Sequence, residues 1–296
     1  MRPASCAHDQ RPHDAASRRL LLAVAVALGV AAVEGLGGLW AGSLALLADA
    51  GHMALDVGAL AATWLARRLA RRPPSWRAPY GWRRLEVGVA LLNGLSLLAM
   101  TAVIAQAALA RAEQPGRIDV ATMAATAAFG FVANVASLRL LHGHTHDIGM
   151  RGAFLHLVGD AANSLAVAVG AAGLWAFGTP AIDTGVSLVI AVVVAASGLP
   201  LIGHAVAILL QLAPRPDGDR ALAARLAQGA DVAATERLQV WQLTGNDWVA
   251  TATLRLTPGA NWPRAYRQGH EALAAAYPNA NVTLELKPSE AERPPS

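Results

Sequence analysis

The chain has 296 residues, of which 54% are apolar and 15% are charged, and its formal net charge at pH 7 is +4. A soluble domain carries about 25% charged residues, and the shortage of charge here is concentrated between Leu20 and Leu212. These numbers exclude a single soluble domain and indicate a membrane unit followed by a small polar domain. Nearly all basic charge is arginine placed beside apolar segments, so nucleic acid is not an expected partner.

Six segments of the chain are long and apolar enough to cross a lipid bilayer, which takes roughly 20 residues in a helix. They cover residues 20–41, 45–66, 84–110, 119–141, 152–177 and 182–210. A cleaved signal peptide is not expected. Arg18 and Arg19 precede an apolar run that is longer than the roughly 7–15 residues of a signal core and leads directly into further membrane sequence.

The distribution of arginine predicts the orientation in the membrane. The connection between the second and third segments is the richest, with Arg67, Arg68, Arg71, Arg72, Arg77, Arg83 and Arg84. The N-terminal tail is also basic, whereas the connections after the first and fifth segments carry no arginine. Since positive loops stay in the cytoplasm, both termini are expected there, with an even number of spans. The Ala/Arg-rich composition favours a bacterial inner membrane.

Beyond Pro214 and Pro216 the pattern changes to that of a small α+β domain. Its expected elements are a helix at 218–229, strands at 238–243 and 248–254, a helix at 261–277 and a strand at 281–286. Gly245-Asn246 between the first two strands is a hairpin signal. A core of about seventy residues is marginal alone, which makes dimerisation through this domain an expectation.

Two of the apolar segments carry histidine and aspartate at helical spacing. The second holds Asp49, His52 and Asp56, and the fifth holds His156 and Asp160. Spacings of three and four residues place side chains on one face of a helix. Charged residues inside spans cost roughly 2.5–3.5 kcal/mol each and mark function by default. Two such pairs at matching depth predict a four-ligand site between two helices, with Asp49 as a possible accessory residue.

The residue types of this predicted site favour one kind of ion. Two imidazole nitrogens and two carboxylate oxygens suit tetrahedral Zn²⁺. Mg²⁺ and Ca²⁺ prefer shells made only of oxygen, and Cu(I) prefers sulfur. The alternative is that each pair is a His–Asp hydrogen bond inside a purely structural bundle.

Three further polar residues lie inside the apolar segments. Asn163 continues the His156–Asp160 face by one turn and is a possible accessory residue. Glu34 is either a pathway or proton-handling residue or a hydrogen-bonded packing residue, and the sequence does not separate these readings. Asn134 is expected to hydrogen bond between helices rather than to bind metal.

A short histidine cluster precedes the fifth segment. His142, His144 and His146 either capture metal for delivery to the site or are simply solvated.

Three motifs resemble signatures of the cation diffusion facilitator family of zinc transporters. They are SLALLADAGHMALD at 43–56, YGWRRLE at 80–86 and RGAFLHLVGD at 151–160. The resemblance extends over residues 19–288. It implies a homodimer of six-helix protomers with a cytoplasmic ferredoxin-like domain, exporting cations in exchange for protons.

The resemblance also implies roles for individual residues. The transport ligands of the family fall on His52, Asp56, His156 and Asp160. A histidine at position 52, where some members carry aspartate, is associated with preference for zinc. The implied organisation is a cytoplasmic tail at 1–18, a transport domain at 19–212, a ferredoxin-like dimerisation domain at 213–288 and a tail at 289–296.

The C-terminal part departs from the family pattern. Family members often carry two histidines where this chain has Glu236 and Gln239, and the strand at 281–286 also lacks histidine. Regulatory metal binding by this domain is therefore not expected.

The function predicted from the sequence is zinc efflux by exchange against protons, with Zn²⁺ as substrate, H⁺ as counter-ion and no cofactor. Binding requires neutral histidine and ionised aspartate, so protons and metal compete. An enzyme is not expected, since the H-E-x-x-H motif of an intramembrane metallohydrolase is missing from the sequence. A membrane metal sensor or scaffold remains an alternative, as does transport of Cd, Co, Fe, Ni or Mn.

Overall fold

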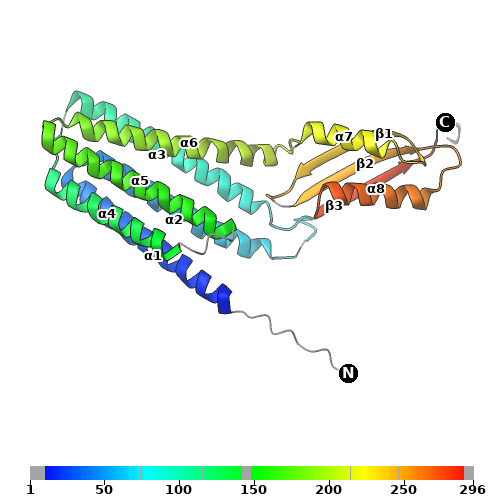
Figure 1. Cartoon of the computed structure of the whole chain (residues 1–296). Coiled ribbons are helices and arrows are strands. Elements are labelled where there is room, and N and C mark those ends of the chain that lie inside the picture. Colours follow the sequence, from blue (N-terminus) through cyan, green and yellow to red (C-terminus); the bar gives the residue numbers. More distant parts are fainter. Residues whose placement is uncertain are drawn as a thin grey trace, which may run out of the picture. The chain divides into compact units, whose positions relative to one another are not determined.

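The computed structural model describes residues 11–73, 75–114, 116–141, 148–213, 215–245 and 247–289. Six long helices come first and a small mixed domain follows (Figure 1). The long helices are α1 (Arg11–Ala41), α2 (Leu44–Ala70), α3 (Leu85–Glu113), α4 (Val120–Leu141), α5 (Ile148–Phe177) and α6 (Ala181–Leu209). Each contains a stretch long and apolar enough to cross a membrane, as the sequence predicts.

Large apolar side chains face outward along these helices. Trp40, Trp175 and Val192 are 77%, 81% and 66% exposed. A water-soluble protein rarely leaves so much contiguous apolar surface uncovered, whereas lipid tails solvate it well. The outer surface of the six helices therefore suits a bilayer.

Glycine sets the sharp connection between α1 and α2. Gly42 has a φ of +69°, a conformation that other residues reach only with strain. The amide of Ser43 donates to the carbonyl of Gly38 at 3.0 Å, which closes α1 with the hydrogen bond of a Schellman motif. The next helix can therefore begin at Leu44 and run back alongside the first.

The described chain divides into two compact units, and each is described by itself. One combines Met1–Ala62 with Leu92–Pro200, and the other combines Thr63–Leu91 with Leu201–Ser296. In the first unit, α4 packs between α1 and α5 (Figure 1). Small residues bring these helices close: a Cβ added at Gly37 of α1 would lie 2.5 Å from the hydroxyl of Thr126 in α4.

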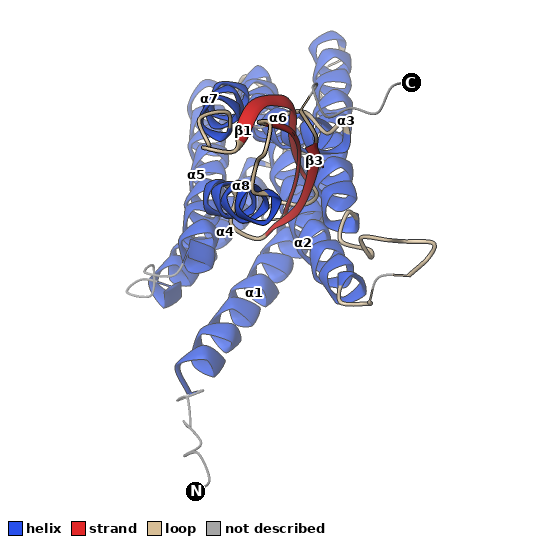
Figure 2. Cartoon of the chain, turned by 90° about the vertical axis from the view of Figure 1, so that its right-hand side faces the viewer, coloured by secondary structure: helices blue, strands red, loops and turns tan. Residues whose placement is uncertain are grey.

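The mixed domain has the order α7 (Pro216–Leu226), β1 (Val232–Gln242), β2 (Trp248–Leu256), α8 (Trp262–Ala276) and β3 (Ala280–Lys287). β2 is the central strand, antiparallel to β1 and parallel to β3. Both helices cover the same face of the sheet (Figure 2). This architecture agrees with the ferredoxin-like domain that the resemblance implies.

The first strand is longer than its sequence pattern predicts. It begins at Val232 rather than at 238. The register between β1 and β2 shifts between Val232 and Ala234 and again between Thr235 and Arg237. Such irregularities interrupt the alternation of side chains, so the pattern that identifies a strand is lost over its first half.

Candidate metal site

The structure brings His52 and Asp56 of α2 together with His156 and Asp160 of α5. The Nε2 atom of His52 lies 3.3 Å from Oδ2 of Asp56 and 3.9 Å from Oδ1 of Asp160. The Nε2 atom of His156 lies 3.3 Å from Oδ2 of Asp56 and 3.8 Å from Oδ2 of Asp160. The two imidazole rings meet edge to face, with centroids 6.1 Å apart.

These four nitrogen–oxygen separations fit a tetrahedral ion. Ligand atoms held at about 2.1 Å from a tetrahedral zinc lie about 3.4 Å from one another. The observed values lie between 3.3 and 3.9 Å. One atom each from His52, Asp56 and Asp160 falls within a mutual distance of 4.8 Å, whereas His156 is not part of this group of three. His52, Asp56 and Asp160 can therefore hold a small divalent cation, and His156 must move inward to complete a tetrahedral set.

Within the described part of the chain, two carboxylate oxygens of the site are not engaged in hydrogen bonds. Asp56 Oδ2 and Asp160 Oδ1 are buried and make no hydrogen bond with any residue that the structure describes. A buried oxygen without a partner is costly, and a cation between the helices would satisfy both. The geometry thus disfavours the alternative in which each His–Asp pair is a structural hydrogen bond.

Exposure is uneven around the four residues. The side chain of Asp160 is 2% exposed and those of His52 and Asp56 are 12% and 14% exposed, but that of His156 is 44% exposed. His156 is therefore the least enclosed of the four side chains.

A second polar cluster lies wholly inside the first unit. It joins Glu34 of α1, Asp49 of α2, Asn134 of α4 and Ser164 of α5, all of which are 0% exposed. Ser164 Oγ lies 3.2 Å from Glu34 Oε1, from Asp49 Oδ2 and from Asn134 Nδ2. Asn134 is the interhelical hydrogen-bonding residue that the sequence predicts.

The residues predicted to be accessory to the metal site do not lie together beside it. Glu34 and Asp49 are not brought to the four-residue site, and Asn163, three residues after Asp160 on α5, is 9% exposed. Ser164 was not among the residues predicted from the sequence. Its position four residues after Asp160, on the same helix face, was the available signal. The histidines at 142, 144 and 146 lie outside the described residues.

The residue that anchors the start of α2 was not predicted from the sequence either. Asp183 of α6 is fully buried and accepts hydrogen bonds from the Ser43 hydroxyl, from the amides of Leu44 and Ala45, and from Arg111 of α3. A carboxylate at the N-terminus of a helix satisfies free amides and complements the helix dipole. Asp183 therefore fixes the start of the helix that carries His52 and Asp56.

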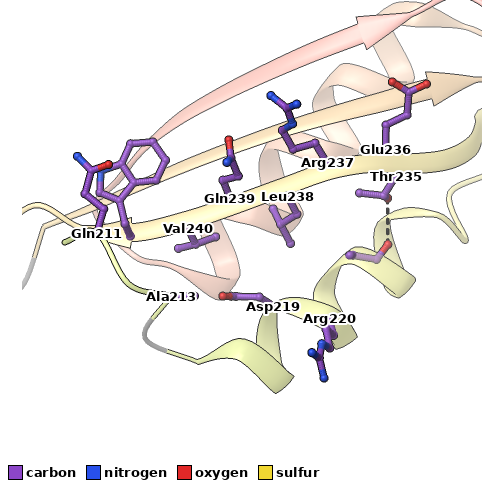
Figure 3. Close-up of a pocket in the computed structure, with 12 residues that line it drawn as sticks. Gln211, Ala213, Asp219, Arg220, Thr235, Glu236, Arg237, Leu238, Gln239 and Val240 are labelled. Carbon is purple, nitrogen blue, oxygen red and sulfur yellow. Dashed lines mark hydrogen bonds between the residues drawn. The ribbon is translucent and has the colours of Figure 1, made fainter. Parts of the chain in front are cut away.

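In the C-terminal domain, the two positions without the family's histidines have other roles. Glu236 pairs with Lys287 at 2.9 Å and with Arg255, and these two cations hold the pKa of its carboxyl below the ordinary value. Gln239 lines a shallow cavity of 640 Å³ beside β1, where Asp219 comes from α7 (Figure 3). Among the described residues of this domain, no group of three metal-binding side chains comes together.

Comparison with known proteins decides the family. Residues 20–210 match the model of the cation efflux transmembrane domain, which is well over half of the chain. The chain belongs to the cation efflux family. This agrees with the resemblance seen in its motifs, and with the six membrane helices and the C-terminal domain of the structure.

Similar curated relatives include several bacterial metal transporters. The zinc transporter ZitB of Shigella flexneri is 33% identical over 287 residues, which cover 96% of this chain and 91% of that protein. ZitB of Escherichia coli K12 is also 33% identical, covering 93% and 89%. A cadmium, cobalt and zinc/H(+)-K(+) antiporter of Bacillus velezensis is 27% identical, covering 76% and 73%. These relatives are transporters rather than enzymes, and this chain is a multi-pass bacterial membrane protein.

Proposed function

We propose that this protein exports Zn²⁺ and binds it between α2 and α5 through His52, Asp56, His156 and Asp160. The observation that carries the proposal is the set of four nitrogen–oxygen separations of 3.3 to 3.9 Å among these side chains. Two nitrogens and two oxygens in that geometry favour zinc over the harder divalent ions. The similarity to zinc transporters over nearly the whole chain supports the same substrate.

Proton exchange follows from the chemistry of the ligands. Histidine binds metal only when neutral, and aspartate only when ionised, so metal and protons compete for the same four side chains. Imidazole changes protonation near neutral pH, which allows a modest proton gradient to load and empty the site. A related protein is named as an antiporter of metal and protons, which supports exchange here.

We further propose the setting in which this exchange works. The arginines at 67–84 favour a cytoplasmic location for that connection and for both termini. The domain at 213–288 then lies in the cytoplasm, with tails at 1–18 and 289–296 and the transport domain at 19–212. Because its core is small, this domain gains stability by pairing with a second copy, and the working unit is a homodimer.

Zinc flux into proteoliposomes tests the proposal and separates a transporter from a membrane sensor. With the interior acidic, the purified protein should accumulate many Zn²⁺ ions per copy, and collapsing the pH gradient should stop net accumulation. A sensor would bind about one ion per site and move none. Accumulation of cadmium or cobalt with no accumulation of zinc would assign a different physiological metal to the same site.

A further inference from the structure

The buried cluster around Ser164 is not explained by metal binding. Its two carboxyl groups come from different helices, Glu34 from α1 and Asp49 from α2, and neither is brought to the metal site. Glu34 Oε2, Asp49 Oδ1 and Asn134 Oδ1 are buried and have no hydrogen-bond partner among the described residues. Each buried polar group in this state needs an explanation, such as a bound proton, water or ion.

The hydrogen bonds of the Ser164 hydroxyl determine the protonation of the cluster. Its oxygen accepts from the amide of Asn134 and lies at 3.2 Å from both carboxyl groups. A hydroxyl has one proton to donate and two lone pairs that accept. It can therefore donate to one carboxylate only, and the other carboxyl must carry a proton and donate it to Ser164. One shared proton satisfies all three contacts.

A metal ion is a poorer occupant than a proton. A Cβ added at Gly130 of α4 would lie 1.9 Å from Glu34 Oε1 and 3.3 Å from Ser164 Oγ. The backbone of α4 thus lies directly against Glu34 and Ser164, which restricts the space for a hydrated cation on that side of the cluster. A proton needs no such space.

We propose that Glu34 and Asp49 form a proton-binding pair, bridged by Ser164, that releases one proton when the metal site fills and regains it when the site empties. This inference rests on the proposed function, and it assigns part of the proton exchange to residues outside the metal ligands.

The charges around the pair explain how the two sites communicate. Asp160 precedes Ser164 by one helical turn on α5 and is 1% exposed, so little water screens its negative charge from the pair. His52 lies one turn beyond Asp49 on α2, and α4 contributes the neutral Asn134. With the metal site empty, a third negative charge beside Asp160 is unfavourable, so the pair keeps its proton.

Metal binding changes this balance. Zn²⁺ bound by two ionised aspartates and two neutral histidines neutralises the negative charge of Asp160 and Asp56 near the pair. Ionisation of the second carboxyl then becomes favourable, and its proton leaves as H⁺. The pair changes from one negative charge to two, and the reverse step restores the proton when zinc departs.

The number of protons released when zinc binds tests the proposed Glu34–Asp49 pair directly. Calorimetric titration of the full-length protein with Zn²⁺, in buffers of different ionisation enthalpy, gives the number of protons released per ion. Glu34→Gln keeps the shape of the side chain but holds its amide protons permanently. It should release about one proton fewer than wild type, with zinc affinity changed less than about threefold.

The double variant Glu34→Gln/Asp49→Asn should also release about one proton fewer, not two, because the pair shares a single proton. Glu113→Gln, an exposed carboxyl on α3, is the matched control and should match wild type. Unchanged release in Glu34→Gln would overturn the proposal, as would a loss of two protons in the double variant.

Zinc–zinc exchange across the proteoliposome membrane distinguishes loss of the proton-binding pair from loss of the folded structure. Such exchange needs a folded, alternating transporter but no net proton movement, so Glu34→Gln should keep it while losing a large part of proton-driven accumulation. Loss of both activities would show that Glu34 is a structural or metal-binding residue. It would overturn the proposal of a proton-binding pair. A wild-type protein that neither binds nor exchanges zinc would instead contradict the proposed function, and with it the role of this pair.

Discussion

Asp183 of α6 accepts a hydrogen bond of 2.5 Å from the hydroxyl of Ser43, 140 residues earlier in the chain. The same hydroxyl accepts from the amide of Leu46 at 3.2 Å, so the two residues together cap the first turn of α2. Arg111 completes the arrangement from α3 at 3.1 Å. The position of His52 and Asp56 along α2 thus depends on a contact at the start of that helix, two to three turns away.

Replacing Asp183 with alanine should destabilise the membrane unit by about 3 kcal/mol, because it leaves Arg111 without its partner and uncaps α2. Asp183→Asn keeps an acceptor for Ser43 and should cost less. Thermal unfolding in detergent measures both effects. If Asp183→Ala unfolds at the wild-type temperature, the anchor contributes little and α2 is positioned by packing alone.

The close packing at Gly130 predicts that a larger residue there destabilises the protein through steric overlap. Gly130→Ala places a methyl group against Glu34 and should destabilise the membrane unit by roughly 1–3 kcal/mol through overpacking. Gly58→Ala is the matched control, since nothing lies within 4 Å of its added Cβ and alanine favours the helix. Equal unfolding temperatures for the two variants would show that the packing around Glu34 yields easily.

The sequence predicts what depends on local pattern. Apolar length identifies the six helices, and the spacings of His52 to Asp56 and of His156 to Asp160 place each pair on one helix face. The contact of Asp183 with Ser43 and the meeting of Glu34 with Ser164 depend on how distant helices align, and no local periodicity encodes that. The start of β1 was misplaced for a related reason, because its register shifts are defined only against β2.

The ion pairs of Glu236 predict how the C-terminal domain responds to acid. Lys287 and Arg255 hold the pKa of this carboxyl below its ordinary value of 4.5. The folded state then binds fewer protons than the unfolded state, so the stabilisation is complete above the ordinary pKa and is lost as pH falls through the lowered one. Hydrogen exchange of the β1–β2 amides in the full chain, corrected for intrinsic rates, should show faster opening as pH falls from about 6 to 3.5.

Glu236→Gln should open faster at pH 6 and should depend less on pH than wild type. Glu271→Gln, an exposed carboxyl on α8, provides the comparison and should leave the profile unchanged. A wild-type pH profile in the Glu236→Gln protein would show that the three charges do not stabilise the sheet.

The histidine at position 52 is predicted to contribute to the preference of the site for zinc. His52→Asp keeps four potential ligands but exchanges a nitrogen for a harder oxygen on a shorter side chain, which both enlarges and hardens the site. Flux of zinc should persist, and the preference for zinc over cadmium or manganese should fall by about tenfold in competition assays. An unchanged preference would mean that His52 does not contact the transported ion.

The most direct test of the four-residue site is zinc flux by the Asp160→Ala protein in proteoliposomes under an imposed pH gradient. Loss of this buried carboxylate removes a ligand, yet the protein should still insert, since an intramembrane charge is lost rather than added. Asp217→Ala, on α7 with a side chain that is 98% exposed, serves as the matched control. We predict that Asp160→Ala abolishes zinc flux at normal membrane expression while Asp217→Ala transports like wild type. Wild-type flux in Asp160→Ala would contradict the site between α2 and α5.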